Sequence, residues 1–200
     1  MAEPNVRDTK LIQYLNEAYG KEKQLETALQ AHIAMTTRPP YKKRLQQHLK
    51  ETKAHGRQVE RRIKQLGGKA ELVPAPGAVG EAASAVTAVA SKAVAAAKGP
   101  LHALRGTGES EIMLKNARTE YSEEAQEIAF YTSIQTLAET VGDKETAKLA
   151  RGIRREEERM AKFLEGQIPQ LTKAVAREEI PAAQRRTNGS ARRRTRARTK

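Results

Sequence analysis

Residues 15–25 read LNEAYGKEKQL and contain the feature that decides the fold. An apolar stripe with the three- and four-residue spacing of a helix runs through this segment, and one glutamate interrupts it. The stripe consists of Leu11, Leu15, Ala18, Glu22, Leu25 and Leu29. A buried carboxylate without a partner is strongly disfavoured by desolvation. Glu22 therefore needs a cationic partner, a metal ion or a raised pKa.

Working outward from this segment, the periodicity predicts an all-α chain with four long helices. Pro and Gly signals separate the helices, and the turn between the last two is short. The predicted helices run from a cap at Asp8 or Thr9 to about Thr36, and over about Tyr41–Leu66, Glu109–Thr140 and Lys144–Leu171. Two antiparallel hairpins joined by a long crossover form the ferritin-like topology.

The segments outside these helices differ in composition. Residues 69–108 contain a Pro/Gly loop and the Ala/Val-rich stretch Glu81–Lys98, which we interpret as a helical crossover that either packs on the bundle or connects loosely. We expect residues 1–178 to form the bundle, with 69–108 as an insertion. Residues 179–200 lose apolar periodicity, so we expect a disordered basic tail.

Composition excludes several function classes. The chain has no cysteine, so a metal site must use carboxylate, imidazole or phenol groups, which favours iron or manganese over structural zinc. No apolar stretch is long enough to span a bilayer, and no secretory leader is present. Phosphate-binding glycine loops and glycine-flanked nucleophilic serines are absent from the sequence. We expect a soluble cytoplasmic protein.

Each of the other three helices also carries an inward carboxylate. The predicted helix over about 41–66 places His48, Glu51 and His55 on one face. The helix over about 109–140 has the stripe Glu120, Glu124, Glu127, Tyr131, Ile134, Ala138 and Val141. The helix over about 144–171 has the stripe Leu149, Ile153, Glu156, Met160 and Phe163. Glu127 follows Glu22 by 105 positions, and Glu156 follows Glu51 by the same number. Equal offsets indicate a pseudo-repeat that gathers four carboxylates around one axis, a geometry suited to two hard cations.

This separation of 105 positions, which we call the offset rule, selects Glu127 over Glu124 as the inward ligand. It also shows one asymmetry between the two hairpins. The position 105 residues after His55 is Met160, a poor ligand for iron or manganese.

Residues 15–25, His48-Leu49-Lys50-Glu51-Thr52 and Glu127-Ile128-Ala129-Phe130-Tyr131 resemble the YciE/YciF family of ferritin-like stress proteins, within the ferritin/rubrerythrin group. The resemblance covers Lys10–Leu66 and Glu109–Leu171. It implies a bundle with a di-iron or di-manganese centre, ferroxidase or peroxide-consuming activity, and a homodimer or higher homo-oligomer. Carried over by position, the metal ligands are Glu22, Glu51, Glu127 and Glu156, with His55 as an addition.

The chain departs from the ferritin-group pattern on helix two. That pattern places a histidine three residues after a glutamate, whereas His55 comes four after Glu51 and three after Thr52.

Alternative readings remain open for these residues. The glutamates could be solvated, or paired with Arg61, Arg62, Arg154 or Arg155. His55 is either a ligand or a hydrogen-bonded histidine at the edge of the stripe. We interpret His48 and Tyr131 as supporting or core residues, and Glu123, Glu157 and Glu158 as solvent-facing charges.

The net charge of +13 is concentrated at the C-terminal end. Eight basic residues and no acidic ones lie in the last sixteen positions: Arg185, Arg186, Arg192, Arg193, Arg194, Arg196, Arg198 and Lys200. Such a run suits sequence-independent neutralisation of DNA or RNA phosphates. The alternatives for the tail are a solubilising segment and contact with an anionic membrane surface, although the tail lacks nearby apolar anchors. For the whole chain, the alternative is a nucleoid-associated scaffold whose binding lies in the tail.

Overall fold

The computed structural model describes residues 5–72 and 108–185, and these ranges contain four long helices. They are α1 (Val6–Met35), α2 (Pro39–Gln65), α5 (Glu109–Thr140) and α6 (Lys144–Glu179). The predicted crossover helix at Glu81–Lys98 and the basic positions from Arg186 onward lie outside the described residues. None of the helices in the described ranges is long and apolar enough to cross a membrane.

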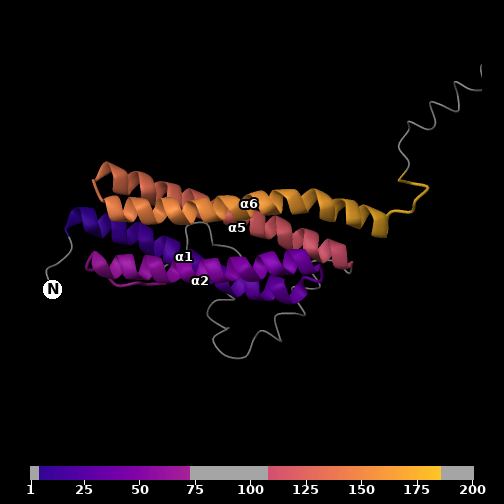
Figure 1. The fold of residues 1–200 in the computed structure, drawn as a ribbon, viewed down its shortest axis with the longest axis horizontal. Helices are drawn as coiled ribbons and strands as arrows, with labels where there is room; N and C mark the ends of the chain where they lie inside the picture. Colours follow the sequence, from indigo (N-terminus) through magenta and orange to yellow (C-terminus); the bar gives the residue numbers. More distant parts are fainter. Residues whose placement is uncertain (1–4, 73–107, 186–200) are drawn as a thin grey trace, which may run out of the picture.

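The helices form two hairpins packed along their lengths (Figure 1). The helix α1 packs on α2, α5 packs on α6, and α1 joins the two hairpins through α5. The helices α2 and α6 also touch, but less extensively than these three pairs. The predicted ferritin-like bundle of two antiparallel hairpins is confirmed.

A polar layer divides the core into two main apolar clusters. One cluster contains Leu25, Leu29, Tyr41, Leu45, Met113, Leu114, Ala117, Met160, Leu164 and Leu171. The other contains Leu15, Ala18, Val59, Ile63, Tyr131, Ile134, Ala150 and Ile153. On the buried face of every helix, the positions between its two cluster segments are mainly polar, for example Glu22 between Ala18 and Leu25. The buried stripes of the four helices therefore bring their polar groups to the same height in the bundle.

Two helix boundaries differ from the sequence prediction. The N-cap of α1 is Asn5, whose side chain accepts a hydrogen bond from the Asp8 backbone amide, instead of Asp8 or Thr9. The helix α6 continues past Leu171 to Glu179, with Pro169 inside it. The apolar face continues beyond this proline, because Leu171 is fully buried and Val175 packs against the same cluster. Packing therefore outweighs the hydrogen bond that Pro169 cannot make.

The turn between α5 and α6 is tied to α2 by a polar network. Gly142 has a φ of 77°, a left-handed conformation that favours glycine. Asp143 caps α6 by accepting from the Thr146 amide at 3.0 Å, and Arg62 of α2 donates to both Asp143 oxygens at 2.8 and 2.7 Å. Arg62 also donates to Thr146 Oγ1 at 2.7 Å. This network holds the two hairpins together at one end of the bundle.

We expect Asp143→Ala to lower the free energy of unfolding by about 1–2 kcal/mol, because it removes a helix cap and leaves Arg62 without its charged partner. Urea unfolding followed by circular dichroism measures the change. Glu145→Ala, in the exposed first turn of the same helix, is the control and should leave the midpoint nearly unchanged. Equal midpoints for the two variants would contradict the role given to Asp143.

Candidate metal centre

Six ionisable side chains meet in the polar layer, and we call them the carboxylate centre. They come from all four helices: Glu22 from α1, His48 and His55 from α2, Glu124 and Glu127 from α5, and Glu157 from α6. None of them exposes more than 1% of its surface. Each occupies a position of its helix's buried stripe, so the three- and four-residue spacing that builds the core also points these groups inward.

The carboxylate centre divides into two groups that share one residue. Within each group, one potential ligand atom from every residue lies within 4.8 Å of the others. The first group is Glu22, His55 and Glu157, and the second is His48, Glu124, Glu127 and Glu157. Glu157 therefore lies between two sets of nitrogen and oxygen donors.

Both histidines turn one ring nitrogen toward the centre and the other toward its edge. His55 Nδ1 lies 2.8 Å from Glu157 Oε1, and its Nε2 lies 2.8 Å from Glu156 Oε2. His48 Nε2 lies 2.9 Å from Glu124 Oε1, and its Nδ1 lies 3.4 Å from Glu51 Oε2. We call Glu51 and Glu156 the rim carboxylates, since their side chains are 21% and 38% exposed.

Many oxygens of the centre accept no hydrogen bond from any described residue. These are both oxygens of Glu127, both oxygens of Glu157, and Oε2 of Glu22 and of Glu124. Glu157 Oε1 has only its ion-pair contact with His55 Nδ1. The other Glu22 oxygen accepts a 2.5 Å hydrogen bond from the Tyr131 hydroxyl. Buried carboxylate oxygens in this state are unstable unless protons or cations neutralise them.

Burial controls the ionisation of three of the carboxyl groups. It raises the pKa of Glu22 to about 8 against the charge of His55. Burial likewise raises the pKa of Glu124 to about 8 against its hydrogen bond with His48. For Glu127, burial and then the charge of Glu22 hold the pKa well above its ordinary value. Without a bound cation, these groups retain protons near neutral pH.

The pKa values of both imidazoles are raised, although burial alone would lower them. Burial lowers the pKa of His48, but hydrogen bonds with Glu124 and Glu51 raise it to about 10. Burial also lowers the pKa of His55, but Glu157 and Glu22 raise it to about 9. For Glu157, burial raises the pKa, but His55 and His48 together outweigh it and the pKa is lowered. The centre therefore stores several exchangeable protons.

A buried lysine lies beside the centre. Lys21 is 2% exposed, forms an ion pair with Glu123, and donates to Gln126 at 3.1 Å. Burial lowers its pKa, while the charges of Glu127 and Glu124 raise it less. Glu123 was predicted to face solvent, but its side chain is only 20% exposed because it pairs with Lys21.

The structure brings together some of the residues singled out by sequence and separates others. Glu22, His55 and Glu127 are in the centre, whereas Glu51 and Glu156 lie at its edge. Glu51 is held by Arg44, whose Nη1 lies 2.9 Å from Glu51 Oε2.

The prediction that Glu157 faces solvent is wrong, because its side chain is fully buried. The cause is a phase error of one residue on α6, whose buried stripe runs through Ala150, Ile153, Glu157, Met160 and Leu164. Glu124 was passed over by the offset rule and is also fully buried. The offset rule is also compatible with Glu157 as the inward residue, since Thr52 and Glu157 are 105 positions apart and both are buried.

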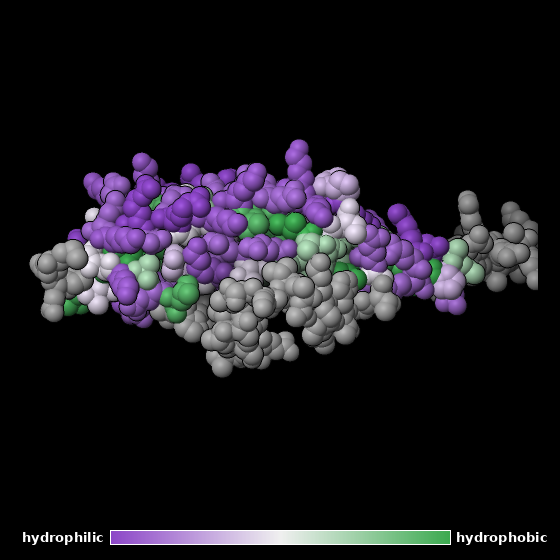
Figure 2. All heavy atoms as spheres, turned by 90° about the horizontal axis from the view of Figure 1, so that it is seen from below, coloured by the Kyte–Doolittle hydropathy of each residue, from purple (hydrophilic) through white to green (hydrophobic). Residues whose placement is uncertain are grey.

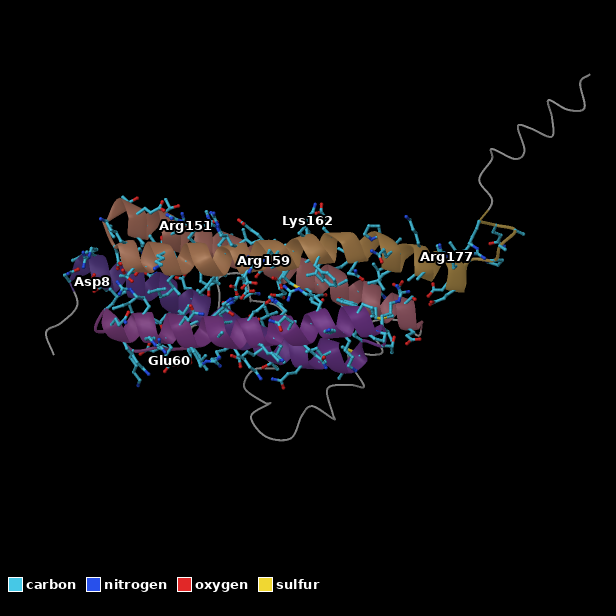
Figure 3. All side chains as sticks on the ribbon, viewed as in Figure 1. Asp8, Glu60, Arg151, Arg159, Lys162 and Arg177 are labelled. Carbon is cyan, nitrogen blue, oxygen red and sulfur yellow. The ribbon has the colours of Figure 1, made fainter. Side chains whose placement is uncertain are left out.

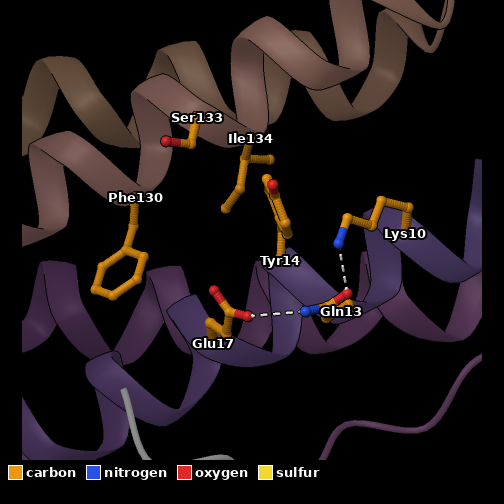
Figure 4. A pocket seen from close by; sticks show the side chains of 7 residues that line it. All are labelled: Lys10, Gln13, Tyr14, Glu17, Phe130, Ser133 and Ile134. Carbon is orange, nitrogen blue, oxygen red and sulfur yellow. Dashed lines mark hydrogen bonds between the residues drawn. The ribbon is translucent and has the colours of Figure 1, made fainter. Parts of the chain in front are cut away.

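A surface pocket between α1 and α5 does not include the centre (Figure 4). Its lining is Lys10, Gln13, Tyr14, Glu17, Phe130, Ser133 and Ile134. Lys10 donates to Gln13 at 2.9 Å, and Gln13 donates to Glu17 at 3.3 Å. These polar groups satisfy one another, so the pocket lacks the convergent free donors and acceptors of the carboxylate centre.

Comparison with known proteins agrees with this architecture. A solved structure from Xanthomonas campestris is 25% identical, with a TM-score of 0.66, covering 86% of this chain and 98% of that chain. The Escherichia coli stress protein YciF is 20% identical with a TM-score of 0.63, covering 84% and 98%. A Desulfovibrio desulfuricans bacterioferritin described with a diiron site is 16% identical with a TM-score of 0.59, covering 86% of each chain.

A search of curated proteins gave no match. The model of a domain of unknown function, DUF892, matches residues 7–177, which include all six residues of the carboxylate centre. The chain therefore belongs to the DUF892 family and has the ferritin-like fold of YciF.

Proposed function

We propose that the chain binds two iron or manganese ions at the carboxylate centre. The observation that carries this proposal is the position of Glu157, which is shared by two groups of ligand atoms. One group would hold the first ion through Glu22 and His55, and the other would hold the second through His48, Glu124 and Glu127. Glu157 Oε1 lies 2.8 Å from His55 Nδ1 and its Oε2 lies 3.8 Å from His48 Nε2, so each oxygen is near the histidine of one group and Glu157 can serve both ions.

The donor set fits these metals. Carboxylate oxygens and imidazole nitrogens suit iron and manganese, whereas the thiolates that favour structural zinc are absent from the sequence. The oxygens without hydrogen bonds belong to all four carboxylates of the centre. Two divalent cations would neutralise these four carboxylates and replace the protons that burial otherwise retains.

In this proposal the rim carboxylates orient the histidines and do not coordinate the metal. Glu156 contacts the outer nitrogen of His55, and Glu51 contacts the outer nitrogen of His48. A carboxylate on the far nitrogen of a ligating histidine fixes its tautomer and ring orientation. The pair Glu51 and Glu156, predicted as ligands, therefore has the same supporting role on the two histidines.

When bound, the metal pair would supply redox chemistry with ferrous iron, oxygen or peroxide as reactants, so we infer a ferroxidase or peroxide-consuming activity. The chain's own residues prepare the site for it. Tyr131 donates to Glu22 and fixes its orientation. Apolar clusters on both sides of the polar layer limit water access. The similarity to a stress protein and to diiron proteins supports this proposal.

We expect the wild-type protein to hold close to two ions per chain after dialysis, and Glu157→Gln to hold far fewer. The substitution keeps the shape of the side chain but removes the charge shared by both groups, and we expect an affinity loss of about 100-fold or more. Elemental analysis of protein reconstituted with manganese, or anaerobically with ferrous iron, measures the ratio. A wild-type ratio near zero would refute the proposal.

Two further variants make this test specific. Glu158→Gln removes the same charge from the neighbouring side chain, which is 47% exposed, and should leave the ratio unchanged. Glu156→Gln should retain two ions at saturation with about 10- to 100-fold weaker affinity, because it affects only the orientation of His55. Loss of one ion at saturation in Glu156→Gln would show that this carboxylate is a ligand.

Metal-free stability should fall as the pH rises from about 5 to 9. Glu22 and Glu124 have folded pKa values of about 8, above those of the unfolded chain, so folding opposes their ionisation in this range. His48 and His55 have folded pKa values of about 10 and 9, so their contribution is complete below about 6.5 and decreases above it. Melting temperatures of the metal-free protein measure this trend.

Bound manganese should reverse the trend, because ions compete with fewer protons at higher pH. The rise in melting temperature on adding manganese should therefore be larger at pH 8 than at pH 5.5. The same rise at both values would indicate that the ions bind elsewhere.

A second candidate function rests on the C-terminal composition. The last sixteen residues contain eight basic and no acidic side chains, a pattern that favours contact with nucleic acid phosphates. Removing residues 185–200 should weaken retention on DNA and leave metal content intact. Unchanged retention after truncation would contradict this role.

A further inference from the structure

The outer face of α2 carries a straight row of basic side chains. Lys43, Lys50, Arg57 and Lys64 are all exposed and follow one another at intervals of seven residues. In an α-helix this interval advances about 10.5 Å along the axis and drifts by only about 20° around it. These four residues, which we call the cation row, therefore extend over about 32 Å on one side of the helix.

Most cations of α2 lack an acidic partner. The helix contains nine lysine and arginine residues and two acidic ones, whereas α6 contains nine and seven. Within the described residues, no ion pair involves Lys42, Lys43, Lys50, Lys53, Arg57 or Arg61. Lys64 pairs with Glu60 at the surface at 2.6 Å, a contact worth little in water. The row thus carries positive charge that the described fold does not neutralise.

The composition of this face limits the class of partner. Gln46, Gln47 and Gln58 are exposed on the same helix and can hydrogen-bond to phosphate and sugar oxygens. The large hydrophobic side chains exposed in the described ranges, Val6, Leu72, Tyr121 and Ile180, all lie outside α2. An amphipathic helix that inserts into a membrane surface requires such apolar anchors.

The figures agree with this description. Figure 1 shows α2 crossing α1 within its hairpin, and Figure 3 labels Glu60, next to the cation row, on the side of α2 away from α6. Seen from below in Figure 2, the described surface is mainly hydrophilic.

We propose that the cation row of α2 binds the sugar–phosphate backbone of double-stranded nucleic acid, independently of base sequence. Duplex DNA carries one negative charge per about 1.7 Å of its axis, so a row of about 32 Å faces a continuous line of phosphates. The single aromatic residue of α2 is the buried Tyr41, so the exposed face offers no ring for stacking on unpaired bases. The absence of such a ring favours a duplex backbone over a single strand. The proposal depends on neither the metal centre nor the basic tail.

The test compares two variants with the same composition and net charge in the full chain. The row variant combines Lys43→Gln, Lys50→Gln, Arg57→Gln and Lys64→Gln. The scattered variant combines Lys10→Gln, Arg118→Gln, Lys144→Gln and Lys173→Gln, which removes three lysines and one arginine from exposed positions on α1, α5 and α6. Circular dichroism and unfolding midpoints verify that both variants fold.

Binding to a mixed-sequence duplex of about 30 base pairs is measured by fluorescence anisotropy between about 50 and 200 mM salt. The row variant should bind at least about tenfold more weakly, and the slope of log affinity against log salt should fall by about three to four. The scattered variant should keep the wild-type slope within about one. Equal losses in both variants would overturn the proposal, since they would reflect net charge alone.

Two further measurements identify the partner and separate the row from the tail. Protein lacking residues 186–200, a deletion that removes no described residue, should retain duplex binding that depends on the cation row and on salt. Absence of duplex binding by this truncated protein would overturn the proposal. Row-dependent binding to vesicles rich in phosphatidylserine, without duplex binding, would also overturn it and assign the face to an anionic membrane.

If the fourfold row variant unfolds, the pair Lys43→Gln with Lys50→Gln and the pair Arg57→Gln with Lys64→Gln replace it. Each pair should lower the salt slope by about two, and two pairs without effect would reject the proposed surface.

Discussion

The rest of the molecule is organised around the burial of four carboxylates between two apolar clusters. Glu22, Glu124, Glu127 and Glu157 are removed from water, while His48 and His55 are the imidazoles placed among them. Desolvation alone would exclude such groups from a helical core, because an isolated buried charge is costly. The protein tolerates them by raising carboxyl pKa values and by retaining protonated imidazoles. In both cases a proton occupies a position that a divalent cation can take. The energetics of the fold are therefore connected with the proposed metal binding.

Much of this arrangement could be predicted from the sequence. The stripes of α1 and α5 were predicted correctly, because their apolar residues recur over many turns and leave a single helical phase. The phase of α6 was ambiguous at three consecutive glutamates, and the large side chains Leu149 and Phe163 favoured Glu156 over Glu157. In the structure, Ala150 and Leu164 lie on the buried face instead. A small alanine gives little signal in a pattern although close helix packing requires it.

The pseudo-repeat of the two hairpins predicted which helix positions lie at the same height, but not which of them carry carboxylates. The offset of 105 residues correctly related Glu22 to Glu127, but the pair that completes the buried layer is Thr52 and Glu157. Thr52 cannot supply a carboxylate, and its hydroxyl donates to the His48 backbone oxygen at 3.0 Å. His48 and Glu124, bonded to each other, supply the additional donors and have no symmetric equivalents. Such compensation depends on contact between α2 and α5, which no spacing within one helix reveals.

The distribution of charge also constrains how ions and polyanions approach the bundle. The unneutralised cations of α2 face outward, so they attract phosphate polymers and repel metal ions on that side. At the edge of the centre, Glu51 and Glu156 are partly exposed and contact the two histidines directly. The helices that carry these rim carboxylates, α2 and α6, pack against each other less extensively than the two helices within either hairpin. Arg44 and Arg159 pair with these rim carboxylates at 2.9 and 3.6 Å, so the charge of the rim is partly neutralised, and the attraction for a cation rests mainly on the buried carboxylates of the centre.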